Sequence, residues 1–140
     1  MNSPQDFTKA YTDAVRNKKV KDFVDLYDAN VLVFDLWDDW QMKGVQDCKD
    51  MAEEWFSSLR EEYVQTTFSD VQIVESADLA FLTCLVRFAG HSAEGKELRF
   101  LDERMSVTLR RISSGQWKVI HQHTSAPIDS RKLVVKLKRA

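Results

Sequence analysis

From about residue 62 onward the hydrophobic pattern is that of strands alone, and this limits the folds that the chain can adopt. Before that point, most apolar residues recur at steps of three and four, the spacing of one helical face, apart from one strand-like run at residues 31–37. After it, four long segments rich in β-branched and aromatic residues read as strands, at residues 63–74, 79–89, 98–111 and 117–125. Helices followed by a run of strands favour an α+β domain whose helices pack on one face of the sheet.

Three helices and one further strand are expected before residue 62. Apolar residues at helical spacing begin at Phe7 and again at Val20, which predicts two short helices. Residues 31–37 are β-branched and aromatic and too few for a typical helix, so they predict a strand. A third and longer helix is predicted from Val45 by one apolar stripe: Cys48, Met51, Ala52, Trp55, Phe56 and Leu59.

The composition is that of a single soluble globular domain. Of the 140 residues, 44% are hydrophobic and 30% are charged, with four glycines and two prolines. These values exclude a disordered, collagen-like or low-complexity chain. A domain of this length buries enough surface to fold without disulfides or a structural metal.

The net charge of −2 combines two unlike parts. Residues 130–140 contain five basic residues and no acidic one, so residues 1–129 contain 15 basic and 22 acidic residues, a net charge of −7. We therefore expect one domain over residues 1–129 and a basic C-terminal tail over residues 130–140. The tail could add a strand, cover a partner or stay solvated, and we expect a solvated terminus.

The remaining sequence signals favour a cytoplasmic protein without cofactor. Cys48 and Cys84 match no CxxC or metal-ligand spacing and are typical of reduced thiols. No apolar stretch approaches the roughly 20 residues of a membrane span, and the start MNSPQDF lacks signal-peptide features. The near-neutral charge, and a tail without aromatic residues for stacking, give no reason to expect a nucleic-acid partner.

The order of the expected elements and the end of the chain resemble the nuclear transport factor 2-like superfamily. Residues 115–127 read GQWKVIHQHTSAP, which matches a G-x-W-x-x-x-H-x-H-x-S-x-P ending. This ending is similar to that of SnoaL-like proteins and of the calcium/calmodulin-dependent protein kinase II association domain. The resemblance covers about residues 5–127. It implies a cone-shaped, cystatin-like fold, in which a curved antiparallel sheet wraps around a long helix, encloses an apolar pocket and forms homodimers through its outer face.

The start of the chain is similar in spacing to ketosteroid isomerases of the same superfamily. Laid without gaps, the isomerase's oxyanion tyrosine falls on Tyr11, a second pocket tyrosine on Tyr27 and the carboxylate base on Asp35. The isomerase's second oxyanion donor, a protonated acid, would fall near Val107, counted back from Gly115. Valine donates no hydrogen bond, so half of that oxyanion hole is expected to be missing.

Asp35 is the best candidate for chemistry. A carboxylate inside an apolar strand loses hydration unless it is paired or its pKa rises. Such a group can accept a proton from a substrate, with Tyr11 stabilising the negative charge that develops. The structural alternative is an acid that pairs with Arg104 or with the ring N–H of a tryptophan, or that faces solvent at the strand end.

The expected ligand-binding residues combine aromatic walls with a few polar groups. Large aromatics near the first strand and third helix suit a flat apolar ligand, although they also suit ordinary core packing. Arg104 could bind an acidic ligand, as pocket arginines do in the association domain, but strand alternation favours an outer ion pair. The candidates are Tyr27, Trp37, Trp40, Trp55, Arg104, Gln122, His123 and Thr124.

His121 and His123 lie two apart on a strand and so share a face. Such a pair could hold a metal ion together with Asp35 or Glu103, but no motif fixes a third ligand, and we expect no metal. In the relatives named, the positions of Ile120, Gln122 and Thr124 face the pocket. Both histidines are then expected on the outer face unless a bulge intervenes.

Two functions remain open at the level of sequence. The first is a protein or enzyme that takes a small apolar or acidic molecule into its pocket, with Asp35 as proton acceptor in an isomerase- or lyase-type reaction. The second is a non-catalytic association module in which the sheet face builds an oligomer, favoured by the absence of an acid at Val107. The fold hosts both kinds of protein.

Overall fold

The computed structural model describes residues 1–139. A short 3-10 turn at Pro4–Asp6 precedes α1 (Phe7–Arg16), α2 (Val20–Val24) and, after β1, the long helix α3 (Val45–Leu59). The strands are β1 (Tyr27–Phe34), β2 (Met42–Lys43), β3 (Tyr63–Glu75), β4 (Leu79–His91), β5 (Glu97–Arg111), β6 (Trp117–Ser125), β7 (Ile128–Asp129) and β8 (Val134–Val135). The three helices and four long strands expected from the sequence are confirmed.

The first strand is displaced from its predicted position. It begins at Tyr27 and ends at Phe34, whereas the sequence predicted residues 31–37. Tyr27 and Val31 are buried, but Ala29 and Asn30 between them are exposed. The first half of the strand therefore has no continuous apolar run by which the sequence could reveal it. Asp35 therefore follows β1 directly and lies at the strand end, two residues after the buried Val33.

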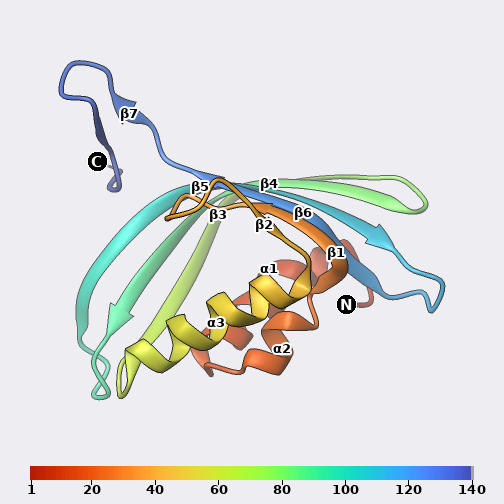
Figure 1. Ribbon diagram of the computed structural model, residues 1–140, viewed down its shortest axis with the longest axis horizontal. Coiled ribbons are helices and arrows are strands. Elements are labelled where there is room, and N and C mark those ends of the chain that lie inside the picture. The colour runs from red at the N-terminus through yellow and green to blue at the C-terminus, as the bar shows by residue number, and fades with distance from the viewer. Residues whose placement is uncertain (140) are drawn as a thin grey trace.

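Strands β1 to β6 form one curved sheet in the order β2-β1-β6-β5-β4-β3. All neighbours run antiparallel except β1 and β6, which are parallel, with Val33 opposite Gln122 and Phe34 opposite His123. The sheet arches over the three helices, which all lie on its concave side (Figure 1). The α+β class and the cone shape are confirmed. The sheet was expected to be antiparallel, and the parallel pairing of β1 with β6 departs from that expectation.

The core lies between the helices and the concave face. Phe23 of α2 is 1% exposed, and its ring packs against those of Tyr11, Tyr27, Trp55 and Phe56, with centroid separations of 5.3 to 6.4 Å. Tilted and edge-on aromatic pairs of this kind stabilise a core beyond the area they bury. This cluster joins all three helices to the start of β1 and fixes two tyrosines that face the cavity described below.

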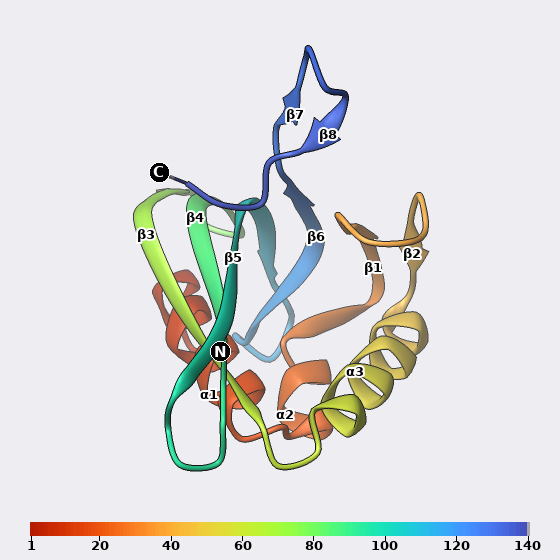
Figure 2. The ribbon, with the colours of Figure 1, turned by 90° about the vertical axis from the view of Figure 1, so that its left-hand side faces the viewer.

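The C-terminal segment forms a short hairpin and is largely exposed to solvent. β7 and β8 form a hairpin that projects from the cone, and the chain then returns along the sheet (Figure 2). Asp102 of β5 holds the returning segment: its N–H donates to Leu137 O at 2.7 Å, and its Oδ2 accepts from Arg139 N at 2.8 Å. A buried outer acid in β5 thus gives the basic segment a partner.

A membrane-spanning segment is not found among the helices of residues 1–139, since none combines sufficient length with an apolar composition.

Candidate functional site

A cavity of about 530 Å³ lies between α3 and the concave face of the sheet. Its walls are mainly apolar, with carboxyl, hydroxyl and amide groups at a few places, as in typical small-molecule sites. Seven of the ten site residues expected from the sequence line it: Tyr11, Tyr27, Asp35, Trp37, Trp55, Gln122 and Thr124.

The other three expected residues lie outside this cavity. Trp40 is 96% exposed in the turn between β1 and β2, where the chain has left the sheet after the positive φ of 64° at Asp38. Arg104 is on the outer face of β5, where its Nε donates to Ser125 Oγ at 3.0 Å. His123 is exposed on the outer face of β6. Alternation along the strands carries both side chains away from the helices.

Asp35 is held at the end of β1 by the neighbouring strand. The Thr124 hydroxyl donates to Asp35 Oδ1 at 3.0 Å and accepts from the Leu36 N–H at 2.9 Å. Burial raises the pKa of the Asp35 carboxyl, and hydrogen bonds from Thr124 and the backbone reduce that rise. Asp35 therefore stands beside the cavity with a carboxyl group that is a stronger base than an exposed aspartate.

Glu103 is the second acid of the site, which the sequence reasoning named only as an alternative metal ligand. It is 6% exposed on β5 and lines the same cavity. Burial, and next the charge of Asp35, raise the pKa of Glu103 from 4.5 to about 7. A signal was available, because Glu103 stands between Leu101 and Met105 in the inward-facing register of the strand.

The two tyrosines differ in what their hydroxyls can do. Tyr27 Oη donates to Gln122 Oε1 at 2.8 Å, so its hydroxyl proton is not available to a ligand. The Tyr11 hydroxyl makes no such bond within residues 1–139 and adjoins the cavity. Burial, followed by the charges of Glu103 and Asp35, raises the pKa of Tyr11 well above its ordinary value. Tyr11 therefore stays neutral and can donate a hydrogen bond to a ligand.

The arrangement of these groups suits the transfer of a proton. Two acids that influence each other in one cavity do not both ionise readily, so the pair carries a single negative charge over a range of pH. The ionised partner can accept a proton, while the neutral one donates a hydrogen bond. Tyr11 supplies a second donor for negative charge on a bound molecule.

The two histidines lie on the opposite face of the sheet. His121 Nδ1 lies 2.7 Å from Leu32 O, and the rings of His121 and His123 both pack edge-on against Phe34. The part of the chain that the structure describes contains no group of three histidine, cysteine or acidic side chains arranged to hold a metal ion. Cys48 and Cys84 are buried free thiols.

Most of the chain matches the model of a known family. The family model that describes a SnoaL-like domain matches residues 5–129, and the chain belongs to this family. No curated protein sequence matches it significantly.

Solved structures show the same nuclear transport factor 2-like fold. A nuclear transport factor 2-like protein of unknown function from Pseudomonas putida KT2440 has a TM-score of 0.84 at 23% identity, covering 97% of this chain and 92% of that one. A protein from Xanthomonas campestris, whose name assigns it to the calcium/calmodulin-dependent protein kinase II association domains, has a TM-score of 0.74 at 14% identity over 88% and 84%. A ketosteroid isomerase-like protein from Erwinia carotovora atroseptica gives 0.69 at 16% identity over 86% and 91%.

Proposed function

We propose that the protein binds a small, largely apolar molecule in its cavity and transfers a proton within it, with Asp35 as the base. The observation that carries this proposal is the presence of two carboxyl groups in one cavity, the half-buried Asp35 and the buried Glu103, beside an unengaged tyrosine. A carbonyl compound with an acidic C–H bond suits this set, because its proton passes to Asp35 while Glu103 and Tyr11 donate to the oxygen that gains charge.

The second acid also changes the comparison with the isomerases. Val107, where the resemblance placed the missing acid, is fully buried in the core and does not line the cavity. Glu103 supplies a carboxyl group four residues earlier on the same face of β5. The absence of an acid at Val107 therefore no longer argues against an oxyanion site.

A neutral probe tests the base directly. We expect the protein to convert 5-nitrobenzisoxazole to 2-cyano-4-nitrophenolate, a reaction in which a base removes the C3 proton and the N–O bond breaks. Asp35→Asn should lower kcat/KM about 100-fold or more, the usual contribution of a positioned base. The rate should rise with pH as Asp35 ionises and fall as Glu103 ionises near pH 7. The phenolate is followed by its absorbance.

The matched control is Asp39→Asn, which neutralises an exposed acid of the same loop outside the cavity. It should leave the rate unchanged. Glu103→Gln should remove the alkaline fall of the pH profile, because glutamine keeps a hydrogen-bond donor at all pH values. Equal rates for the wild type and Asp35→Asn would reject Asp35 as the base.

A second candidate function is association between copies of the chain, and the hairpin of β7 and β8 favours it. Four of its apolar side chains are exposed by 43 to 79%: Ile128, Leu133, Val134 and Val135. A two-stranded hairpin that carries its apolar residues outward is marginally stable alone, and such clusters mark interaction surfaces. The hairpin segment is basic and residues 1–129 carry a net charge of −7, so a second copy offers complementary charge.

We expect sedimentation velocity at micromolar concentration to show a homodimer. The double variant Leu133→Ser with Val134→Ser should shift the protein toward the monomer, because it removes apolar surface from the contact. Trp40→Ser changes an even more exposed apolar residue at another place and serves as control. A monomeric wild type would contradict the association function.

A further inference from the structure

Arg99 is the only lysine, arginine or histidine that lines the cavity in the described part of the chain. It lies on β5 four residues before Glu103, and alternate residues of a strand share a face. Four residues of extended strand span about 13 Å. The cavity therefore carries its single cation, Arg99, and one of its acids, Glu103, at well-separated places along one strand.

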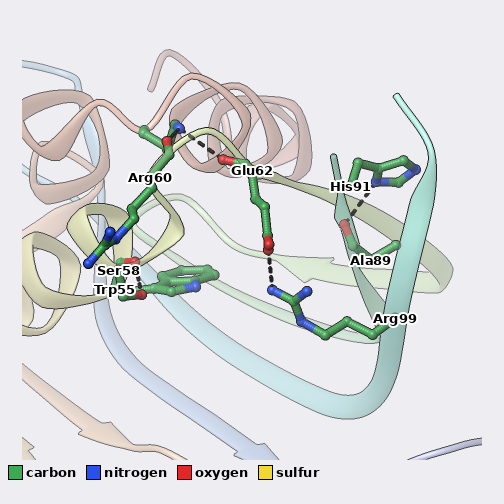
Figure 3. A network of polar contacts seen from close by, with 8 residues as sticks. Trp55, Ser58, Arg60, Glu62, Ala89, His91 and Arg99 are labelled. Carbon is green, nitrogen blue, oxygen red and sulfur yellow. Dashed lines mark hydrogen bonds and ion pairs between the residues drawn. The ribbon is translucent and has the colours of Figure 1, made fainter. Parts of the chain in front are cut away.

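The backbone of β4 gives the Arg99 side chain its position. Gly90 stands opposite Arg99 in the sheet, and a Cβ atom there would lie 3.1 Å from Arg99 Cζ. The absence of a side chain at Gly90 lets the arginine lie across the strand toward the C-terminal end of α3. Figure 3 shows Arg99 pointing toward Glu62, on the same side as Trp55.

The guanidinium keeps donors for a ligand. Its Nη2 donates to Glu62 Oε1 at 2.5 Å, the only hydrogen bond of this side chain within residues 1–139. A guanidinium has five N–H donors arranged as a fork that fits a carboxylate. The Arg99 side chain is 58% exposed and that of Glu62 36%, and ion pairs this accessible to water contribute little stability. A ligand carboxylate can therefore bind beside Glu62 or replace it at small cost.

The other charges of the cavity direct an anion to this place. Asp35 and Asp38 repel a carboxylate from the far part of the cavity, and Glu54 does so from α3. Between Arg99 and the acidic pair the walls are apolar, with Trp55, Phe88 and Leu101 among the lining residues. A bound acid thus has one favourable orientation.

We infer that the ligand of this cavity is an elongated carboxylic acid with an apolar middle, whose carboxylate binds Arg99 while its opposite end reaches Asp35 and Glu103. The position of the reacting end rests on the proposed function. Arg99 then determines which molecules bind and which way round they lie, and it takes no part in the proton transfer.

Calorimetric titration with a matched pair of probes tests this inference. The probes are 4′-acetylbiphenyl-4-carboxylate, which has a carboxylate at one end and a methyl ketone at the other, and the corresponding neutral carboxamide. The wild type should bind the acid about 10-fold or more tightly than the amide, as a charge-assisted pair predicts. Arg99→Gln should abolish that preference and leave the affinity for the amide unchanged.

Two further variants test whether the position of the arginine decides the preference for the acid. Arg104→Gln removes an arginine from the outer face of the same strand and should retain the preference. Gly90→Ala keeps the charge but displaces the guanidinium, and should reduce the preference. Equal affinity for acid and amide in the wild type, an unchanged preference in Arg99→Gln, or no binding of either probe would overturn the inference. Turnover of 5-nitrobenzisoxazole, which has no carboxylate, reports on Asp35 separately.

Discussion

Replacing Phe23 with alanine is expected to lower the free energy of unfolding by about 3 to 5 kcal/mol, the usual range for a buried phenylalanine. The ring is 1% exposed and packs against four other aromatic rings, so its removal leaves a void that few neighbours can fill. Two of those rings are Tyr11 and Tyr27. Chemical denaturation monitored by tryptophan fluorescence gives the change in free energy.

Phe81→Ala is the matched control, because this phenylalanine of β4 is 46% exposed. Its loss removes much less buried area and should cost well under half as much. The wild-type slope of free energy against denaturant should be retained in both variants if the transition stays two-state. A loss at Phe23 no larger than that at Phe81 would contradict the central position given to the α2 ring.

The stability of the protein is expected to fall as the pH rises through 7, and Glu103→Gln is expected to remove most of that fall. The pKa of Glu103 is raised from 4.5 to about 7 in the folded chain. Between these values the folded protein holds a proton that the unfolded chain has released, so stability is complete below pH 4.5 and is lost as pH rises through 7. A rise from 4.5 to about 7 corresponds to about 3 kcal/mol at pH 8.

Denaturation of the wild type and Glu103→Gln at pH 5 and pH 8 measures this difference. The two proteins should be close in stability at pH 5, and the variant should be more stable by about 3 kcal/mol at pH 8. Glu97→Gln changes an exposed acid of the same strand and should leave the pH dependence as it is. Parallel curves for wild type and Glu103→Gln would show that Glu103 holds no extra proton.

The fold was largely predictable because its signals are local. The stripe from Cys48 to Leu59 and the alternation in residues 98–111 each report the face that a single element buries. The alternation that favours an outer position for Arg104, although Arg104 was expected to bind a ligand, also places Glu103 inside, between Leu101 and Met105. The resemblance instead aligned the isomerase acid with Val107, four residues further along the same face of the strand.

Other parts of the site depend on contacts that no local pattern contains. The cation Arg99 reaches the cavity because Gly90, on another strand, leaves room for it. Trp40 was expected at the pocket rim for its aromatic ring, yet a backbone turn at Asp38 carries it into solvent. The C-terminal segment folds back because Asp102 accepts a backbone N–H from it. Each of these outcomes is decided by the pairing of distant segments.

The parallel pairing of β1 with β6 has a consequence for the order in which the protein folds. Asp35 meets Thr124 across 89 residues of sequence, and Tyr27 meets Gln122 across 95. Contacts this distant along the chain form late and slow the folding of small domains. During synthesis the helices can dock before β6 has left the ribosome, but the acidic pair then has no Thr124 beside it. The cavity gains its polar wall only when the last long strand enters the sheet.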